Sequence, residues 1–86
     1  MITTLRSLCG LGWELKIESN EGSGVIIGNT IQESYSGNDL ISAHEIGVID
    51  GIESMALALV CAGIGGYEDR VSHAIDTAIE ALTNYY

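Results

Sequence analysis

Two cysteines and two histidines are the residues of this sequence that could take part in covalent catalysis. A cysteine nucleophile needs a neighbouring base, and the candidates are Cys9, Cys61, His44 and His73. Cys61 falls in an apolar segment, where burial raises the pKa of a thiol and leaves it unreactive. No oxyanion-type glycine motif surrounds either cysteine. We therefore expect a protein that is not an enzyme and whose two thiols are reduced.

A second possible chemistry is metal binding by histidine and carboxylate side chains. Asp69 and His73 lie four residues apart and would share one face of a helix. The other candidates are His44, Glu45 and Asp76. Zinc sites carry tighter signatures, such as HExxH or paired CxxC, and the sequence has neither. The glycine-rich spots also lack the spacing of phosphate-binding loops, so we expect no metal and no cofactor.

Carboxylates dominate the charge of the chain. Twelve Asp and Glu residues against three Lys and Arg give a formal net charge of −9 at pH 7. A protein that neutralises nucleic-acid phosphates or docks on anionic lipid needs basic residues, so we expect neither partner. The acidic charge either engages a basic surface on a protein partner or keeps a small apolar protein in solution. Composition alone leaves both interpretations open.

The candidates for partner binding are three pairs of carboxylates. One pair projects from a predicted strand and the other two share helix faces: Glu14 with Glu18, Asp50 with Glu53, and Asp76 with Glu80. Small acidic phage proteins that block host nucleic-acid enzymes, anti-CRISPR inhibitors among them, have this size and charge. That is an analogy of size, charge and coarse topology, not of motifs. The alternatives are a homo-oligomeric assembly subunit and, third, a small metal protein or enzyme.

Small residues form a stripe along a predicted long helix, at spacings of three and four: Gly47, Gly51, Ser54, Ala58 and Cys61. A glycine inside a helix costs about 0.5–1 kcal/mol relative to alanine, and close approach of another backbone usually compensates. That backbone belongs either to the final helix of the same chain or to a second copy in a symmetric homodimer. Tyr85 and Tyr86 are further candidates for self-association, because tyrosine is enriched at interfaces.

The N-terminal part of the chain predicts strands after an initial turn. Residues 1–11 carry apolar residues at near-helical spacing, which predicts a short helix or turn. Residues 13–18 alternate strictly and predict a half-buried strand. Residues 19–24 predict a hairpin loop and residues 25–27 the returning strand. Either a tight turn at Gly28-Asn29 and a third strand over 30–35 follow, or the second strand continues through a bulge at Gly28.

The C-terminal part predicts two helices. Residues 42–45 match a capping box in front of an apolar run of helical period, so a long helix is expected over 42–63. Gly63 is a natural residue to end it. A final helix is expected over 67–84, and the short glycine link between the two implies an antiparallel helical hairpin.

These elements define a single α+β domain over residues 1–86, with a hairpin or meander at 12–35. A small antiparallel sheet of two or three strands is expected to pack on the helical hairpin. The packed sheet face would comprise Trp13, Leu15, Ile17, Val25 and Ile27, and would meet Val71, Ile75 and Leu82. Residues 1–13 lack the unbroken apolar run of a signal peptide, and the longest apolar stretch, residues 55–64, is too short to span a bilayer. We therefore expect a cytoplasmic protein.

Overall fold

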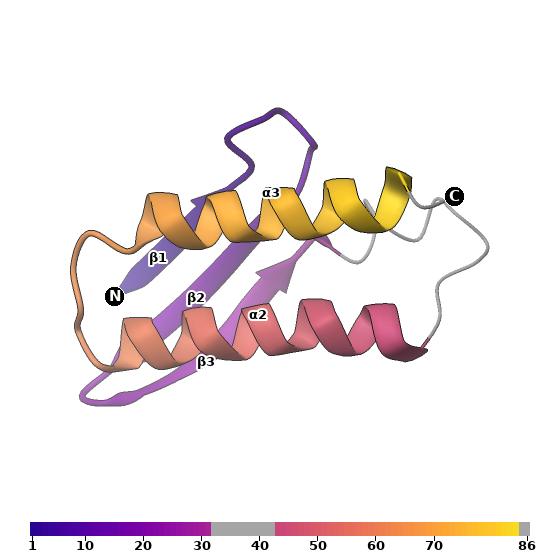
Figure 1. Cartoon of the computed structure of the whole chain (residues 1–86). Coiled ribbons are helices and arrows are strands. Elements are labelled where there is room, and N and C mark those ends of the chain that lie inside the picture. The colour runs from indigo at the N-terminus through magenta and orange to yellow at the C-terminus, as the bar shows by residue number, and fades with distance from the viewer. Residues whose placement is uncertain (32–42, 85–86) are drawn as a thin grey trace.

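The protein folds into two layers, a three-stranded sheet and a pair of helices (Figure 1). A computed structural model describes residues 1–31 and 43–84. The elements are the strands β1 (Ile2–Arg6), β2 (Glu14–Asn20) and β3 (Ser23–Asn29), and the helices α2 (Ala43–Cys61) and α3 (Glu68–Asn84). The sheet is antiparallel with the order β1-β2-β3, and both helices lie across one of its faces. The predicted α+β fold, with a C-terminal helical hairpin, is confirmed.

The N-terminal segment is a strand, so the prediction of a short helix or turn over residues 1–11 is wrong for its first half. β1 pairs with β2 in a register that places Leu5 opposite Leu15. Leu5 is buried, whereas Ile2 and Thr4 are exposed, which is the alternation of a half-buried strand. Backbone pairing with β2 outweighs the weak helical spacing of a short segment that contains three β-branched residues.

The turn between β2 and β3 is shorter than the predicted loop. The two strands extend to Asn20 and from Ser23, and only Glu21 and Gly22 connect them. Both turn residues have positive φ, 45° and 84°, as a type I′ hairpin turn requires. The tighter turn lengthens each strand beyond the bounds that turn-forming residues indicated.

A bulge follows in β3, at the point where the sequence left two alternatives. Ile17 pairs with Ile26 and Lys16 pairs with Gly28, so Ile27 is the extra residue of β3. Gly28 and Asn29 continue the strand and do not form a tight turn, which favours one long, bulged strand. Residues 32–35, most of the expected third strand, lie outside the described residues.

The prediction that Val25 and Ile27 face the helices is wrong, because the strand register pairs Ile26 with the buried Ile17 and Val25 with the exposed Glu18. Val25 and Ile27 are 56% and 47% exposed, whereas Ile26 packs against the core. The rest of the predicted sheet face is buried as expected. The core joins it to one side of each helix and comprises Leu5, Trp13, Leu15, Ile17, Ile31, Ile49, Ala56, Val60, Tyr67, Val71, Ile75 and Ile79.

Both helices are confirmed within a residue or two of the predicted bounds. Gly63 has a φ of 68° just after α2, and its N–H donates to the carbonyl of Val60 at 3.1 Å. The Ser42 end of the predicted capping box lies outside the described residues.

Candidate functional site

The small residues of α2 lie on its solvent side. Gly47, Gly51, Ser54 and Ala58 are exposed, and we call this set the α2 outer face. Cys61, the last residue of the predicted stripe, is half-buried and is not part of it. A Cβ added at Gly47 or Gly51 would meet no atom within 4 Å. The interpretation in which the final helix of the same chain packs on this stripe is therefore wrong. α3 contacts α2 along a different side, where α2 places larger side chains such as Leu59.

Charged side chains are nearly absent from the exposed surface of α2. Glu45 and Glu53 are buried, at 6% and 7% exposure. Asp50 is the one exposed charged side chain among residues 45–61. Val48 and Met55 flank the outer face and are 36% and 46% exposed. An exposed helix side with one charge and several uncovered apolar groups is typical of a contact surface.

Asp76 is buried, so the prediction that it contributes to an acidic partner surface is wrong. Its carboxylate accepts four hydrogen bonds from N–H and O–H groups of one loop: Ser7 Oγ at 2.7 Å, Leu8 N at 3.0 Å, Cys9 N at 3.1 Å and Trp13 Nε1 at 2.7 Å. The thiol of Cys9 bonds to it as well. Burial alone would raise the pKa of Asp76, but these donors favour the charged form and lower it below its ordinary value of 3.8. The carboxylate fastens the β1–β2 loop to α3.

Glu53 is buried as well, and its assignment to the partner surface is also wrong. Asn29 donates from Nδ2 to Glu53 Oε1 at 2.7 Å, and its own Oδ1 accepts from the N–H of Ile31 at 2.8 Å. Burial raises the pKa of Glu53 above its ordinary value of 4.5, against the effect of the Asn29 hydrogen bond. This carboxyl links α2 to the end of β3.

The open face of the sheet carries the other predicted carboxylates of the strands. Glu14 pairs with Arg6 at 3.1 Å and with Lys16 at 3.4 Å. Glu18 lies in register between Ile2 and Val25, which are 60% and 56% exposed. Glu18 makes no ion pair with any residue of 1–31 or 43–84. The open face thus combines apolar groups with one carboxylate that has no counter-ion in the part of the chain that the structure describes.

The structure does not bring the six predicted carboxylates together. Asp50 and Glu80 are exposed on different helices, Glu14 and Glu18 lie on the opposite side of the molecule, and Glu53 and Asp76 are internal. Tyr85 and Tyr86 lie outside the described residues.

The residues considered for catalysis are dispersed. Cys9 and Cys61 are free thiols, the first exposed and the second half-buried against Gly24. The pKa of Cys9 is raised above 9.0, chiefly because its thiol bonds to the Asp76 carboxylate. His73 is exposed, and the side chain of His44 lies outside the part that is described. Within the described residues, no three His, Cys, Asp or Glu side chains are grouped closely enough to hold a metal ion.

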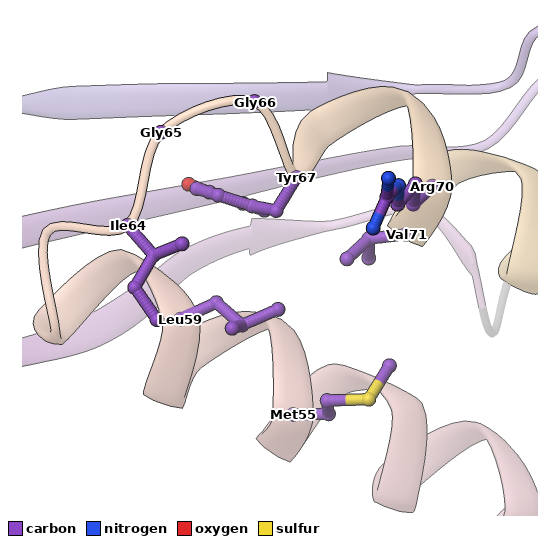
Figure 2. Close-up of a pocket in the computed structure, with 8 residues that line it drawn as sticks. All are labelled: Met55, Leu59, Ile64, Gly65, Gly66, Tyr67, Arg70 and Val71. Atoms are coloured by element: carbon purple, nitrogen blue, oxygen red, sulfur yellow. The ribbon is translucent and has the colours of Figure 1, made fainter.

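A groove at the α2–α3 connection was not anticipated from the sequence. It has a volume of about 300 Å³ and opens between the C-terminal half of α2, the connector and the first turn of α3 (Figure 2). Its lining residues are Met55, Leu59, Ile64, Gly65, Gly66, Tyr67, Arg70 and Val71. The connecting glycines signalled a turn, but nothing local indicated that the apolar residues on both sides of it would leave a hollow.

Taken together, the fold and these surfaces define a small α+β domain with a helix side of low charge, an open sheet face and a groove at the α2–α3 connection. Comparison of the chain with family models, with curated proteins and with solved structures finds no match. None of the helices in the described ranges has the length and apolar character needed to cross a bilayer. Function is therefore inferred from the chain's own residues.

Proposed function

We propose that this protein is a small non-enzymatic binding protein that self-associates through the α2 outer face and engages a basic surface of a protein partner. The observation that carries the proposal is the combination of exposure and low charge along α2, where Asp50 is the one exposed charge of residues 45–61. Water-facing helix sides are ordinarily rich in charged residues. A side that lacks them is better suited to contact with another apolar surface.

Electrostatics favours this side for contact between copies. Two chains of net charge −9 repel each other, so a stable contact should form where carboxylates are fewest. Small residues such as Gly51 and Ala58 allow two helix axes to approach closely, and a two-fold axis would bring the same stripe of both copies together. The flanking Val48 would then lose its exposed apolar surface to the partner helix.

Sedimentation velocity over a dilution series tests self-association. We expect a monomer–dimer equilibrium, and we expect Ala58→Gln to weaken it at least tenfold without changing the charge. The control is Thr77→Gln, an exposed site on α3 away from this face, which should leave the equilibrium unchanged. A chain that stays monomeric at millimolar concentration, or equal effects of the two variants, would refute this part of the proposal.

A glycine-to-alanine substitution provides a second test, because it should change the stability of the monomer and the affinity of the dimer in opposite directions. Gly51→Ala has free space in one chain and should raise the stability of the monomer by about 1 kcal/mol through helix propensity. The same added methyl group would separate two closely packed α2 helices and weaken the dimer. If stability and self-association rise together, the α2 outer face is not the contact.

We assign partner binding to the open sheet face, because Glu18 lies there between two exposed aliphatic side chains and has no counter-ion within the described residues. A lysine or arginine flanked by apolar residues would complement it. By analogy with acidic phage inhibitors of similar size, the partner class is a nucleic-acid-processing or defence enzyme with a basic surface. A homo-oligomeric assembly subunit is the alternative, and it would associate beyond a dimer without any partner.

Inhibition assays with a panel of purified nucleases, CRISPR effector complexes included, test the partner class. We expect inhibition of one enzyme, loss of that inhibition in Glu18→Lys, and its retention in Glu21→Lys. Glu21 undergoes the same charge change but lies in the hairpin turn. If both variants lost inhibition equally, the effect would come from net charge alone. That result would count against the sheet face as the partner-binding surface.

A further inference from the structure

The groove at the α2–α3 connection keeps apolar side chains in contact with water. Met55 and Ile64, two of its lining residues, are 46% and 49% exposed. Figure 2 shows Leu59 and Ile64 converging from α2 and from the connector, with Val71 on the α3 side. Tyr67, which is itself buried, lines the groove next to the connecting glycines. The hollow is thus walled mainly by hydrocarbon, as small-molecule sites usually are.

Arg70 supplies a positive charge at the same place. The chain has three Lys and Arg residues, and two of them, Arg6 and Lys16, pair with Glu14 on the sheet. Arg70 lines the groove and makes no ion pair with the residues described at 1–31 and 43–84. In a chain of net charge −9, a guanidinium that pairs with no carboxylate of residues 1–31 or 43–84 and lies beside an apolar hollow is complementary to an anion attached to a hydrocarbon chain.

The start of α3 strengthens this complementarity. The helix begins at Glu68, and the groove is lined by the two glycines and Tyr67 immediately before it. The N-terminal end of a helix carries a partial positive charge, which adds to that of Arg70. Glu68 and Asp69 are exposed and do not line the groove.

We propose that this groove binds a medium-chain aliphatic carboxylate. The alkyl chain lies against Met55, Leu59 and Ile64, and the carboxylate accepts hydrogen bonds from the Arg70 guanidinium. A volume of about 300 Å³ is at the lower end of the range for ligand pockets, which selects a short chain over a long-chain fatty acid. Each methylene that enters the groove should raise the affinity about fourfold until the groove is full.

Amide chemical shifts of the full-length chain, followed during titration with sodium octanoate, test the site. We expect saturable shifts centred on Gly65 and Gly66, and an affinity at least tenfold higher than for octan-1-ol, which has the same chain and no charge. Octyltrimethylammonium should not bind. Hexanoate should bind more weakly than octanoate by the stated factor per methylene. Equal affinity for the three head groups, or shifts that map elsewhere, would overturn the proposal.

Two variants separate the contributions of the head and of the tail. Arg70→Gln should lower octanoate affinity to the level of octanol and leave octanol binding unchanged. Ile64→Ser should weaken both ligands alike. Lys16→Gln, which removes a positive charge from the sheet face, is the control and should change neither. If Arg70→Gln and Lys16→Gln weaken octanoate equally, binding follows net charge and the groove is not the site. Sedimentation of the same samples reads self-association separately, so failure of one proposal leaves the other standing.

Discussion

The indole N–H of Trp13 donates a 2.7 Å hydrogen bond to Oδ1 of Asp76, which lies 63 residues further along the chain. Both side chains are buried, with exposures of 2% and 1%. An isolated buried carboxylate would be strongly destabilising, and this one is tolerated because the hydrogen-bond donors of the β1–β2 loop compensate for the water it loses. The bond therefore couples the start of β2 to the middle of α3, and it anchors the loop between β1 and β2.

Removing the charge of Asp76 should destabilise the fold substantially. Asp76→Asn keeps the shape of the side chain but replaces one carboxylate oxygen by an NH2 group. That group is a hydrogen-bond donor, and it would face other donors of the β1–β2 loop. Hydrogen bonds to charged groups contribute about 1.5–3 kcal/mol, and several are weakened together, so we expect a loss of at least about 2–3 kcal/mol in the free energy of unfolding. Urea denaturation followed by circular dichroism measures it. Asp69→Asn, at an exposed carboxylate in the first turn of the same helix, is the control and should change stability by less than about 1 kcal/mol.

Trp13→Phe isolates one of the four hydrogen bonds. It keeps a large aromatic ring in the core and deletes the indole donor. In a double-mutant cycle with Asp76→Asn, we expect a coupling free energy of about 1–2 kcal/mol, because each change removes the same bond. Strictly additive effects would show that the Trp13–Asp76 bond contributes nothing beyond the packing of the ring.

Asp76 and Glu53 should affect the pH dependence of stability in opposite directions. The pKa of Asp76 is lowered by folding, so its contribution is complete above the ordinary value of 3.8 and is lost as the pH falls through the folded pKa below it. The pKa of Glu53 is raised by folding, so the folded state binds its proton first. As the pH falls through that raised pKa towards 4.5, protonation of Glu53 adds stability.

Unfolding free energies of the native chain and of two variants, measured between pH 3 and pH 7, check both signs. Relative to Glu53→Gln, the native chain should gain stability as the pH falls towards 4.5 and then level off. Relative to Asp76→Asn, it should keep a constant advantage down to about pH 4 and lose it below. A native chain that loses stability relative to Glu53→Gln on acidification above pH 4.5 would contradict the assignment of Glu53 as a desolvated carboxyl.

Local patterns were sufficient to predict some of the elements. Helical periodicity indicated α2 and α3, and strict alternation indicated β2, because each segment is long enough for its period to be distinct. β1 was missed because its five residues fit a helix or a strand equally well. Only its pairing with β2, with Leu5 opposite Leu15, decides in favour of a strand.

The candidate site was less predictable, because burial of a polar group depends on residues distant in sequence. Asp76 has the helical position of a boundary residue, and its four donors come from 63–69 residues earlier in the chain. Glu53 is likewise covered through Asn29, which is 24 residues away. The spacing of carboxylates along a helix therefore indicated a shared face but not whether that face was covered.

Gly24 should not tolerate a larger side chain, because neighbouring atoms of the same chain lie close to it. The glycines of α2, in contrast, have open space around them. A Cβ at Gly24 would lie 2.8 Å from Cys61 Sγ and 3.1 Å from the carbonyl oxygen of Glu18. We expect Gly24→Ala to cost about 1–3 kcal/mol, as overpacking usually does. Gly28→Ala is the control within the same strand, because its Cβ would meet Lys16 at an ordinary 3.5 Å. Thermal and urea unfolding of the two variants compares them.

A second substitution identifies the atom responsible. Cys61→Ala removes the sulfur, so in combination with Gly24→Ala it should restore part of the lost stability. The restoration should be incomplete, because the Glu18 carbonyl belongs to the backbone of β2 and remains close. If Gly24→Ala proves as stable as Gly28→Ala, β3 and the end of α2 do not pack closely enough at Gly24 to exclude a methyl group.

Cys9 should be an exposed thiol that is nevertheless slow to react. Its bond to the Asp76 carboxylate and, to a smaller extent, the nearby charge of Glu80 raise the pKa of the thiol above 9.0. The thiolate is the reactive form, so iodoacetamide labelling of Cys9 should follow pH with a midpoint above 9.0. Mass spectrometry of peptides containing Cys9, in a Cys61→Ala background, measures the rate.

Two carboxylate variants separate this electrostatic effect from simple access to the reagent. Glu80→Gln should lower the midpoint pH of Cys9 labelling slightly, and Asp76→Asn should lower it further. Asp76 has the larger effect because it accepts a hydrogen bond from the thiol and also repels the thiolate. A faster rate at every pH with an unchanged midpoint would instead mean that the variants only loosen the β1–β2 loop. Since access to reagent changes the plateau and electrostatics changes the midpoint, the pH profile decides between the two.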